Sequence, residues 1–154
     1  MRFLLASIKS IGVYVKQYAM VAAGGLGLTG GRAPSGPLNA QIGISDPCNH
    51  ECVFCWDHPP KDRENADTAQ RFGQVRPGVM PLQQFKGIVD DLYGMGTRRI
   101  DLIGRGEPLL NRSVVDMIRY AKGRGMQLQI VTNGSRLFES VAKEFVAAGM
   151  DRVQ

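Results

Sequence analysis

The N-terminal part of the chain carries one amphipathic pattern and then a segment rich in glycine. Over residues 2–18, apolar side chains recur three or four positions apart, at Leu4, Ile8, Ile11, Val15 and Tyr18. This spacing predicts an amphipathic helix, whose apolar face could lie on a membrane surface but more often packs on the main domain. Residues 24–37 contain many glycines and two prolines, so we expect a linker there.

From residue 38 onward, short apolar segments alternate with longer segments of helical periodicity. The expected strands cover residues 38–44, 99–103, 128–132 and 152–154, and they are rich in Ile, Val and Leu, as buried parallel strands are. The expected helices between them have apolar faces with helical spacing. These faces are Leu82, Phe85, Ile88 and Leu92 in the first helix, Val114, Ile118 and Ala121 in the second, and Leu137, Val141, Phe145 and Ala148 in the third. Each helix is expected to end at a glycine, at position 94 or 96, 123 or 125, and 149.

This alternation predicts an α/β fold with right-handed crossovers and a parallel sheet, either an open doubly wound sheet or part of a barrel. In both architectures ligands bind at the carboxyl ends of the strands. Cys48 follows the first expected strand, residues 104–108 follow the second, and residues 132–134 follow the third. We therefore expect these three segments to meet at one edge of the sheet.

The last element of the pattern is short. Residues 151–154 open a fourth strand, and the sequence ends within it. A parallel strand of so few residues lacks its helical cover. We expect a fragment of a longer protein, with an N-terminal helix and linker over residues 1–37 and a truncated core domain over residues 38–154.

Composition and charge fit a folded domain. The chain has 154 residues, 44% of them hydrophobic, which is enough to bury a core. Its formal net charge of +5 is spread along the sequence and does not form a block, which indicates a solvated, slightly basic surface, so no nucleic acid partner is expected. Apolar runs of the roughly 18 residues needed to cross a bilayer are absent, as is a secretory signal, and we expect a cytoplasmic protein.

Cys48, Cys52 and Cys55 lie within eight positions, directly after the first expected strand, and the chain has three cysteines in all. An odd number so closely spaced cannot form an intramolecular disulfide framework, which indicates a reducing compartment and a metal. Thiolates select zinc, copper or iron-sulfur clusters. Three cysteines can hold a cluster that leaves one iron open, or they can complete a tetrahedral zinc site with His50 or His58.

The spacing Cys-x3-Cys-x2-Cys after a first strand, with Phe54 before the third cysteine, resembles the signature of the radical S-adenosylmethionine (radical SAM) superfamily. The resemblance covers residues 38–154 and implies an incomplete βα barrel, that is, a partial TIM barrel. It implies that Cys48, Cys52 and Cys55 bind a 4Fe-4S cluster whose fourth iron is chelated by S-adenosylmethionine. Phe54 would contact the adenine side of that cofactor, although a place in the core suits this aromatic residue equally well.

Residues 104–110, Gly-Arg-Gly-Glu-Pro-Leu-Leu, resemble the Gly-Gly-Glu-Pro segment of the same superfamily. The resemblance implies that Gly106 and Glu107 are cofactor-binding positions, suited to an ammonium group. Arg105 stands where the family most often has glycine, and a side chain that points outward would leave the binding backbone intact. An ordinary strand-to-helix turn is the alternative interpretation.

Two shorter segments complete the candidate site. Thr132 and Asn133 belong to a Thr-Asn-Gly segment similar to one found after the third strand in many relatives, and they are further candidate cofactor contacts. A tight Asn-Gly turn explains this segment equally well. Trp56, Asp57 and His58 follow the third cysteine, and we expect them to shape the loop that carries it.

The resemblance implies an enzyme in which a flavodoxin or ferredoxin reduces the cluster. Cleavage of S-adenosylmethionine then gives a 5′-deoxyadenosyl radical, which abstracts hydrogen from a substrate such as a peptide or a cofactor precursor. The resemblance assigns no further catalytic residue, and we expect this length of chain to turn over poorly by itself. Two alternatives remain open: a Cys3His zinc module that binds nucleic acid, and a non-catalytic iron-sulfur electron carrier.

Overall fold

The computed structural model describes residues 15–16, 18–30, 35–55, 57–58 and 78–154. Within these described residues, four strands and three helices alternate along the core, with one short 3-10 helix, η1. In chain order the elements are β1 (Asn39–Ile42), α3 (Leu82–Gly94), β2 (Arg99–Leu102), η1 (Pro108–Leu110), α4 (Val114–Gly123), β3 (Gln127–Ile130), α5 (Glu139–Ala147) and β4 (Arg152–Val153). The strands pair in the order β1-β2-β3-β4, and every pair is parallel. The predicted α/β fold is confirmed, with strand ends that differ by at most two residues.

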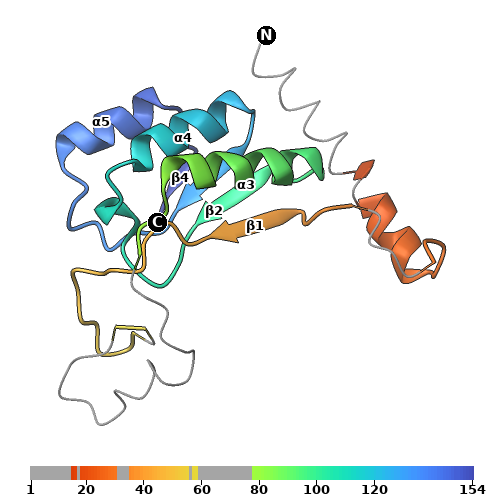
Figure 1. Ribbon diagram of the computed structural model, residues 1–154, viewed down its shortest axis with the longest axis horizontal. Helices are drawn as coiled ribbons and strands as arrows, with labels where there is room; N and C mark the ends of the chain where they lie inside the picture. The colour runs from red at the N-terminus through yellow and green to blue at the C-terminus, as the bar shows by residue number, and fades with distance from the viewer. Residues whose placement is uncertain (1–14, 17, 31–34, 56, 59–77) are drawn as a thin grey trace.

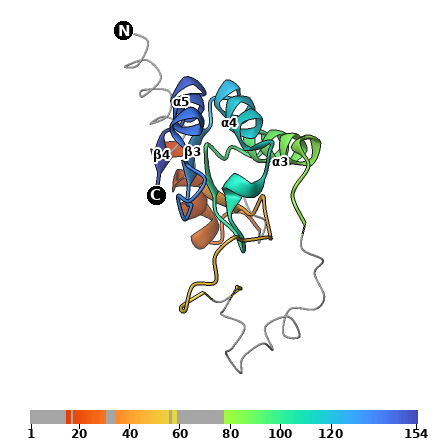
Figure 2. The same cartoon turned by 90° about the vertical axis from the view of Figure 1, so that its left-hand side faces the viewer.

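The helices α3, α4 and α5 lie side by side on the same face of the sheet (Figures 1 and 2). An open doubly wound sheet carries helices on both faces. Helices on one face, with strands in sequential order, are instead the arrangement of a βα barrel. The structure therefore has the architecture of a partial TIM barrel.

The core lies between the sheet and its helices. Each of α3, α4 and α5 turns its predicted apolar face toward the strands, and these side chains are fully or partly buried. The fully buried members are Phe85 and Val89 of α3, Val114, Met117, Ile118 and Ala121 of α4, and Phe145 of α5, which pack on Ile42, Ile100, Leu102, Leu128 and Ile130 of the sheet. Burial of apolar surface of this kind supplies most of the stability of such a fold.

The predicted glycine stops are confirmed, each two residues beyond the last residue of its helix. Gly96, Gly125 and Gly149 have φ values of 98°, 79° and 79°. This left-handed conformation is strained for residues that carry a Cβ atom. After each glycine the next N–H donates to a carbonyl five residues back, as Thr97 does to Leu92 at 3.0 Å, so each helix ends in a Schellman-type turn.

The face of the sheet without helices is polar, which differs from the uniformly buried strands that the sequence pattern predicts. Asn39 Nδ2 donates to Asp101 Oδ2 at 2.6 Å, and Asp101 Oδ1 accepts from Arg99 Nε at 3.3 Å. Arg99 Nη2 donates to Gln129 Oε1 at 3.1 Å, and Gln129 Nε2 donates to Gln154 Oε1 at 2.9 Å. We call these five side chains the polar ladder, because they run across the sheet from β1 to the residue that follows β4.

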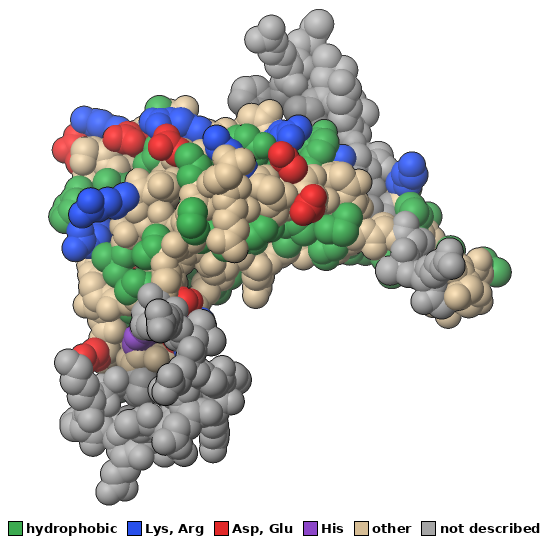
Figure 3. Space-filling view, in the orientation of Figure 1, with side chains coloured by type: hydrophobic (Ala, Val, Ile, Leu, Met, Phe, Trp, Pro, Cys, Tyr) green, Lys and Arg blue, Asp and Glu red, His purple; other side chains and the backbone are tan. Residues whose placement is uncertain are grey.

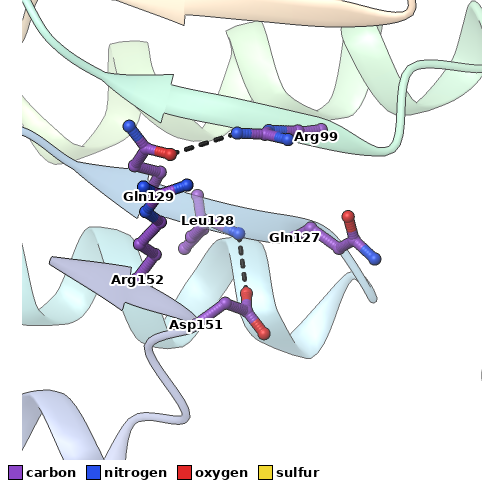
Figure 4. Close-up of a pocket in the computed structure, with 6 residues that line it drawn as sticks. All are labelled: Arg99, Gln127, Leu128, Gln129, Asp151 and Arg152. Carbon is purple, nitrogen blue, oxygen red and sulfur yellow. Dashed lines mark hydrogen bonds between the residues drawn. The ribbon is translucent and has the colours of Figure 1, made fainter. Parts of the chain in front are cut away.

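A pocket lies beside the polar ladder, at the amino ends of the strands (Figure 4). It is lined by Arg99, Gln127, Leu128, Gln129, Asp151 and Arg152. One carboxylate oxygen of Asp151 accepts the Leu128 N–H at 2.7 Å and helps to close its wall. The pocket and the cysteines therefore occupy opposite ends of the strands.

The charged side chains are mixed over the helix-covered surface (Figure 3). Lys143 Nζ pairs with Glu139 at 2.7 Å within α5, and Arg119 of α4 pairs with Asp116 at 2.9 Å and with Glu144 of α5 at 3.6 Å. Interleaved pairs of opposite sign do not create one strongly basic face. This arrangement fits the solvated surface that the sequence predicts.

The N-terminal prediction is tested only in part, because residues 1–14 and 17 lie outside the described residues. Residues 15–16 and 18–25 are helical, and turns follow at 26–30. Val15 and Tyr18 are 63% and 62% exposed, so this end of the predicted apolar stripe does not pack on the sheet. Within the described part of the chain, no helix combines the length and the apolar character needed to span a membrane.

Two glycine-to-alanine substitutions are expected to change stability in opposite directions. At Gly104 a Cβ atom would lie 2.5 Å from the Cα atom of Gly43, so Gly104→Ala forces the ends of β1 and β2 apart and costs about 1–3 kcal/mol of unfolding free energy. At Gly87, within α3, nothing lies within 4 Å of the added methyl, so Gly87→Ala gains about 0.5–1 kcal/mol. Urea unfolding of both variants measures the two changes in unfolding free energy. Equal changes would contradict the close approach of the two strand ends.

Candidate functional site

The loop after β1 is anchored at its base. Ile44 and Ser45 are only 1% and 3% exposed. The Ile44 carbonyl accepts a hydrogen bond from the Met80 N–H at 3.0 Å, and Ser45 forms an isolated antiparallel bridge with Val79. The segment before α3 thus fixes the start of the loop that carries the cysteines.

Asn111, which follows η1, adds a second anchor to the same base. Asn111 is buried, with 2% of the residue exposed. Its Nδ2 donates to the carbonyl oxygens of Ile44 at 2.9 Å and Met80 at 3.0 Å. Its Oδ1 accepts the Ser113 N–H at 2.9 Å. This residue is not among the sequence-based predictions, because an Asn before a helix usually indicates a cap and not a bond to a distant loop.

The backbone of the Gly-Arg-Gly-Glu-Pro segment packs directly on the loop after β1. Gly106 N–H donates to Ser45 O and Glu107 N–H donates to Pro47 O, both at 3.0 Å. A Cβ atom on Gly106 would overlap the carbonyl oxygens of Asp46 and Pro47, so this position requires glycine. An ammonium group only donates hydrogen bonds, so a ligand's ammonium group would have to meet the carbonyl oxygens of the segment and not its N–H groups.

The Glu107 carboxylate joins the loop after β2 to the loop after β3. Glu107 is 2% exposed, and its Oε1 accepts hydrogen bonds from the Leu109 N–H at 2.8 Å and from Thr132 Oγ1 at 2.6 Å. Its Oε2 accepts the Asn133 N–H at 2.8 Å. Three donors therefore converge on one buried carboxylate, and a charged acceptor makes such hydrogen bonds stronger than neutral ones.

Asn133 continues this connection to the first cysteine. Its Nδ2 donates to Asn49 Oδ1 at 3.0 Å and lies 4.0 Å from Cys48 Sγ. Asn49 Nδ2 in turn donates to Ser135 Oγ at 2.7 Å. The structure thus gathers Gly106, Glu107, Thr132, Asn133 and Cys48 at the carboxyl ends of β1, β2 and β3, as predicted.

The third cysteine sits in a tight turn. Cys55 N–H donates to Cys52 O at 2.9 Å, and His58 N–H donates to Cys55 Sγ at 3.1 Å. His58 Nε2 lies 2.7 Å from the Asp46 carbonyl oxygen, an acceptor only, so that nitrogen carries the proton. His58 therefore shapes the loop as expected, while Trp56 lies outside the described residues.

Arg105 meets this end of the loop through its side chain. Its Nε donates to Asp57 Oδ1 at 3.0 Å, in an ion pair between side chains that are 41% and 28% exposed. The Arg105 side chain is thus partly exposed and contacts the cysteine loop through its guanidinium group. Neither composition nor spacing indicated its partner.

The loop carrying the three cysteines extends from the end of β1 away from the sheet (Figures 1 and 2). Cys48, Cys52 and Cys55 are free and half-buried. Phe54 is 86% exposed, so the alternative of a core position for this residue is wrong. Among the described residues, no three His, Cys, Asp or Glu side chains are placed to hold a metal ion.

The sequence model of the radical SAM superfamily matches residues 42–154, which include all of these loops. The chain therefore belongs to the radical SAM superfamily. It is 31% identical over 115 residues to the probable GTP 3′,8-cyclase of Thermococcus kodakarensis, a match that covers 75% of this chain and 33% of the cyclase. It is 36% identical over 98 residues to the S-adenosylmethionine-dependent nucleotide dehydratase of Lacinutrix mariniflava, which covers 64% of this chain and 19% of that protein.

Solved structures show the same fold. The crystal structure of BtrN in complex with AdoMet and 2-DOIA matches 75% of this chain and 44% of that one with a TM-score of 0.59 at 18% identity. Streptococcus suis SuiB bound to its precursor peptide SuiA matches 77% of this chain and 23% of that one with a TM-score of 0.58, also at 18% identity. The chain thus spans a third or less of the curated relatives above and less than half of these solved chains.

Glu107→Gln is expected to lower the free energy of unfolding by about 1–3 kcal/mol, because the new amide presents a donor where three donors already converge. Glu139→Gln is the matched control. The Glu139 side chain is 83% exposed, and its loss should change stability by no more than about 0.5 kcal/mol. Urea unfolding of the two variants measures the difference. Equal effects would show that the buried carboxylate does not hold the loops together.

Proposed function

We propose that this chain binds a 4Fe-4S cluster through Cys48, Cys52 and Cys55 and S-adenosylmethionine at the fourth iron. The observation that carries the proposal is the position of the cysteine loop. Its base is hydrogen-bonded to the loop after β2, and Asn49, next to the first cysteine, is hydrogen-bonded to the loop after β3. The donor set fits, because three thiolates can hold such a cluster and leave one iron open. When bound, the pair would supply reductive cleavage of the sulfonium and a 5′-deoxyadenosyl radical that abstracts hydrogen from a substrate.

The chain's own residues have distinct proposed roles. The cysteines would provide the thiolate ligands, and the exposed Phe54 would cover the adenine side of S-adenosylmethionine. Gly106 would expose backbone oxygens to the ammonium group of that cofactor. Glu107 would act mainly through Thr132 and Asn133, since its carboxylate already accepts hydrogen bonds from both.

Iron is favoured over zinc by the surroundings of the histidines. His58 Nε2 is in hydrogen-bond contact with Asp46 O, so a zinc ion would have to use the other ring nitrogen or break this contact. His50 is exposed. Membership of the superfamily adds weight to the enzyme over the non-catalytic electron carrier.

The names of the relatives support a small-molecule substrate. A GTP 3′,8-cyclase, a nucleotide dehydratase and a Pyrococcus furiosus protein that modifies the cofactor of a tungsten enzyme all match this chain. We therefore propose a nucleotide or a cofactor precursor as the substrate class, in preference to a peptide. A cytoplasmic flavodoxin or ferredoxin would donate the electron.

Anaerobic reconstitution with iron and sulfide tests this proposal. We expect a brown protein with up to about four irons per chain, and an electron paramagnetic resonance signal of the reduced cluster that shifts when S-adenosylmethionine is added. Cys48→Ser, Cys52→Ser and Cys55→Ser should each lose most of the iron, whereas His50→Ala should retain it. Colourless protein that binds zinc, or a cluster signal indifferent to S-adenosylmethionine, would contradict the proposal.

A further inference from the structure

We propose that the Arg105–Asp57 ion pair is a positioning device that holds the Cys55 end of the cysteine loop over the end of β2. This inference rests on the proposed function, because the ion pair would serve to restrain Cys55 as a ligand of the cluster. It assigns a role to the residue that departs from the family's Gly-Gly-Glu-Pro pattern. The pair joins residues 48 positions apart in sequence, at an Nε to Oδ1 distance of 3.0 Å.

The backbone of Arg105 is a rigid base for such a contact. Gly104 packs against Gly43 so closely that an added Cβ would lie 2.5 Å from the Gly43 Cα. Gly106 packs on the carbonyls of Asp46 and Pro47. Arg105 is therefore fixed on both sides, and its side chain is the part of the segment that can reach outward.

The cysteine loop needs restraint at this end. On the Cys48 side, the loop after β3 already holds Asn49 through hydrogen bonds with Asn133 and Ser135. The middle of the loop is open, with Val53 and Phe54 62% and 86% exposed. Around Cys55, the contacts with more distant segments are those of His58 with Asp46 and of Asp57 with Arg105, within the part of the chain that the structure describes.

The pair acts on Cys55 through a short connection. Asp57 is two residues beyond the thiol, and the next N–H, that of His58, donates to Cys55 Sγ at 3.1 Å. A restraint on Asp57 thus limits the positions of both the thiol and its hydrogen-bond donor. Because the two charged side chains are partly exposed, the effect of the pair should be small and local, not a change in global stability.

The first test uses the metal-free chain and does not depend on a cluster. Amide hydrogen exchange over residues 52–58 should become about two to five times faster in Arg105→Gln and in Asp57→Asn, and the double variant should be no faster than either. Arg105→Lys should restore part of the protection. The charge swap Arg105→Asp with Asp57→Arg should also restore part of it, since it keeps both the pair and the net charge. Lys143→Gln, which removes an ion pair of α5 with the same change in charge, should leave this segment unchanged.

The second test uses the reconstituted chain. Iron loss to a chelator under anaerobic conditions should be about two to five times faster in Arg105→Gln than in the parent chain or in Lys143→Gln, with an unchanged midpoint of thermal unfolding. Unchanged exchange in Arg105→Gln, or fully additive effects of the two single variants, would overturn the positioning role. If the parent chain takes up no iron, the proposed function fails, while the exchange experiment still decides whether the pair restrains the loop.

Discussion

The candidate site depends on one buried carboxylate. Glu107 accepts hydrogen bonds from the loop after β3 while its own backbone N–H donates to the loop after β1. Beyond the ends of neighbouring parallel strands the ladder of hydrogen bonds stops, so the polar groups of the loops need other partners. A charged acceptor shielded from solvent supplies that connection and orients three donors at once. The carboxyl edge of the sheet is therefore a connected polar structure and not three independent loops.

Much of the fold could be predicted from the sequence, because its driving force is periodic. The apolar faces of α3, α4 and α5 repeat with helical spacing, and glycine marks each helix end. The exposure of each strand face was predicted less well. The side chains of Arg99, Asp101 and Gln129 alternate with buried apolar residues in β2 and β3, but in segments of four residues this alternation is hard to distinguish from a continuous apolar run.

The candidate site residues could be predicted better than their contacts. Cysteine spacing and glycine-rich turns are local signals, so the sequence alone singles out Cys48, Gly106 and Glu107. Hydrogen bonds between positions far apart, such as Asn111 with Ile44 or Asn133 with Asn49, leave no local trace. For Phe54 the sequence left two alternatives open, a cofactor contact and a place in the core. Only the three-dimensional structure, in which this side chain is exposed, excludes the core.

The polar ladder restricts the register in which the strands can pair. If β2 slid by one residue along its neighbours, the Asp101 carboxylate would turn toward the helices and lose the amide of Asn39. Arg99, which lies on the same strand and face, would turn with it and lose the side-chain oxygen of Gln129. Ile100 would turn the other way and leave the core. A shifted alignment would thus place charged side chains in an apolar layer and expose an apolar side chain to solvent. The native alignment of these short strands is therefore far more favourable than an alignment shifted by one residue.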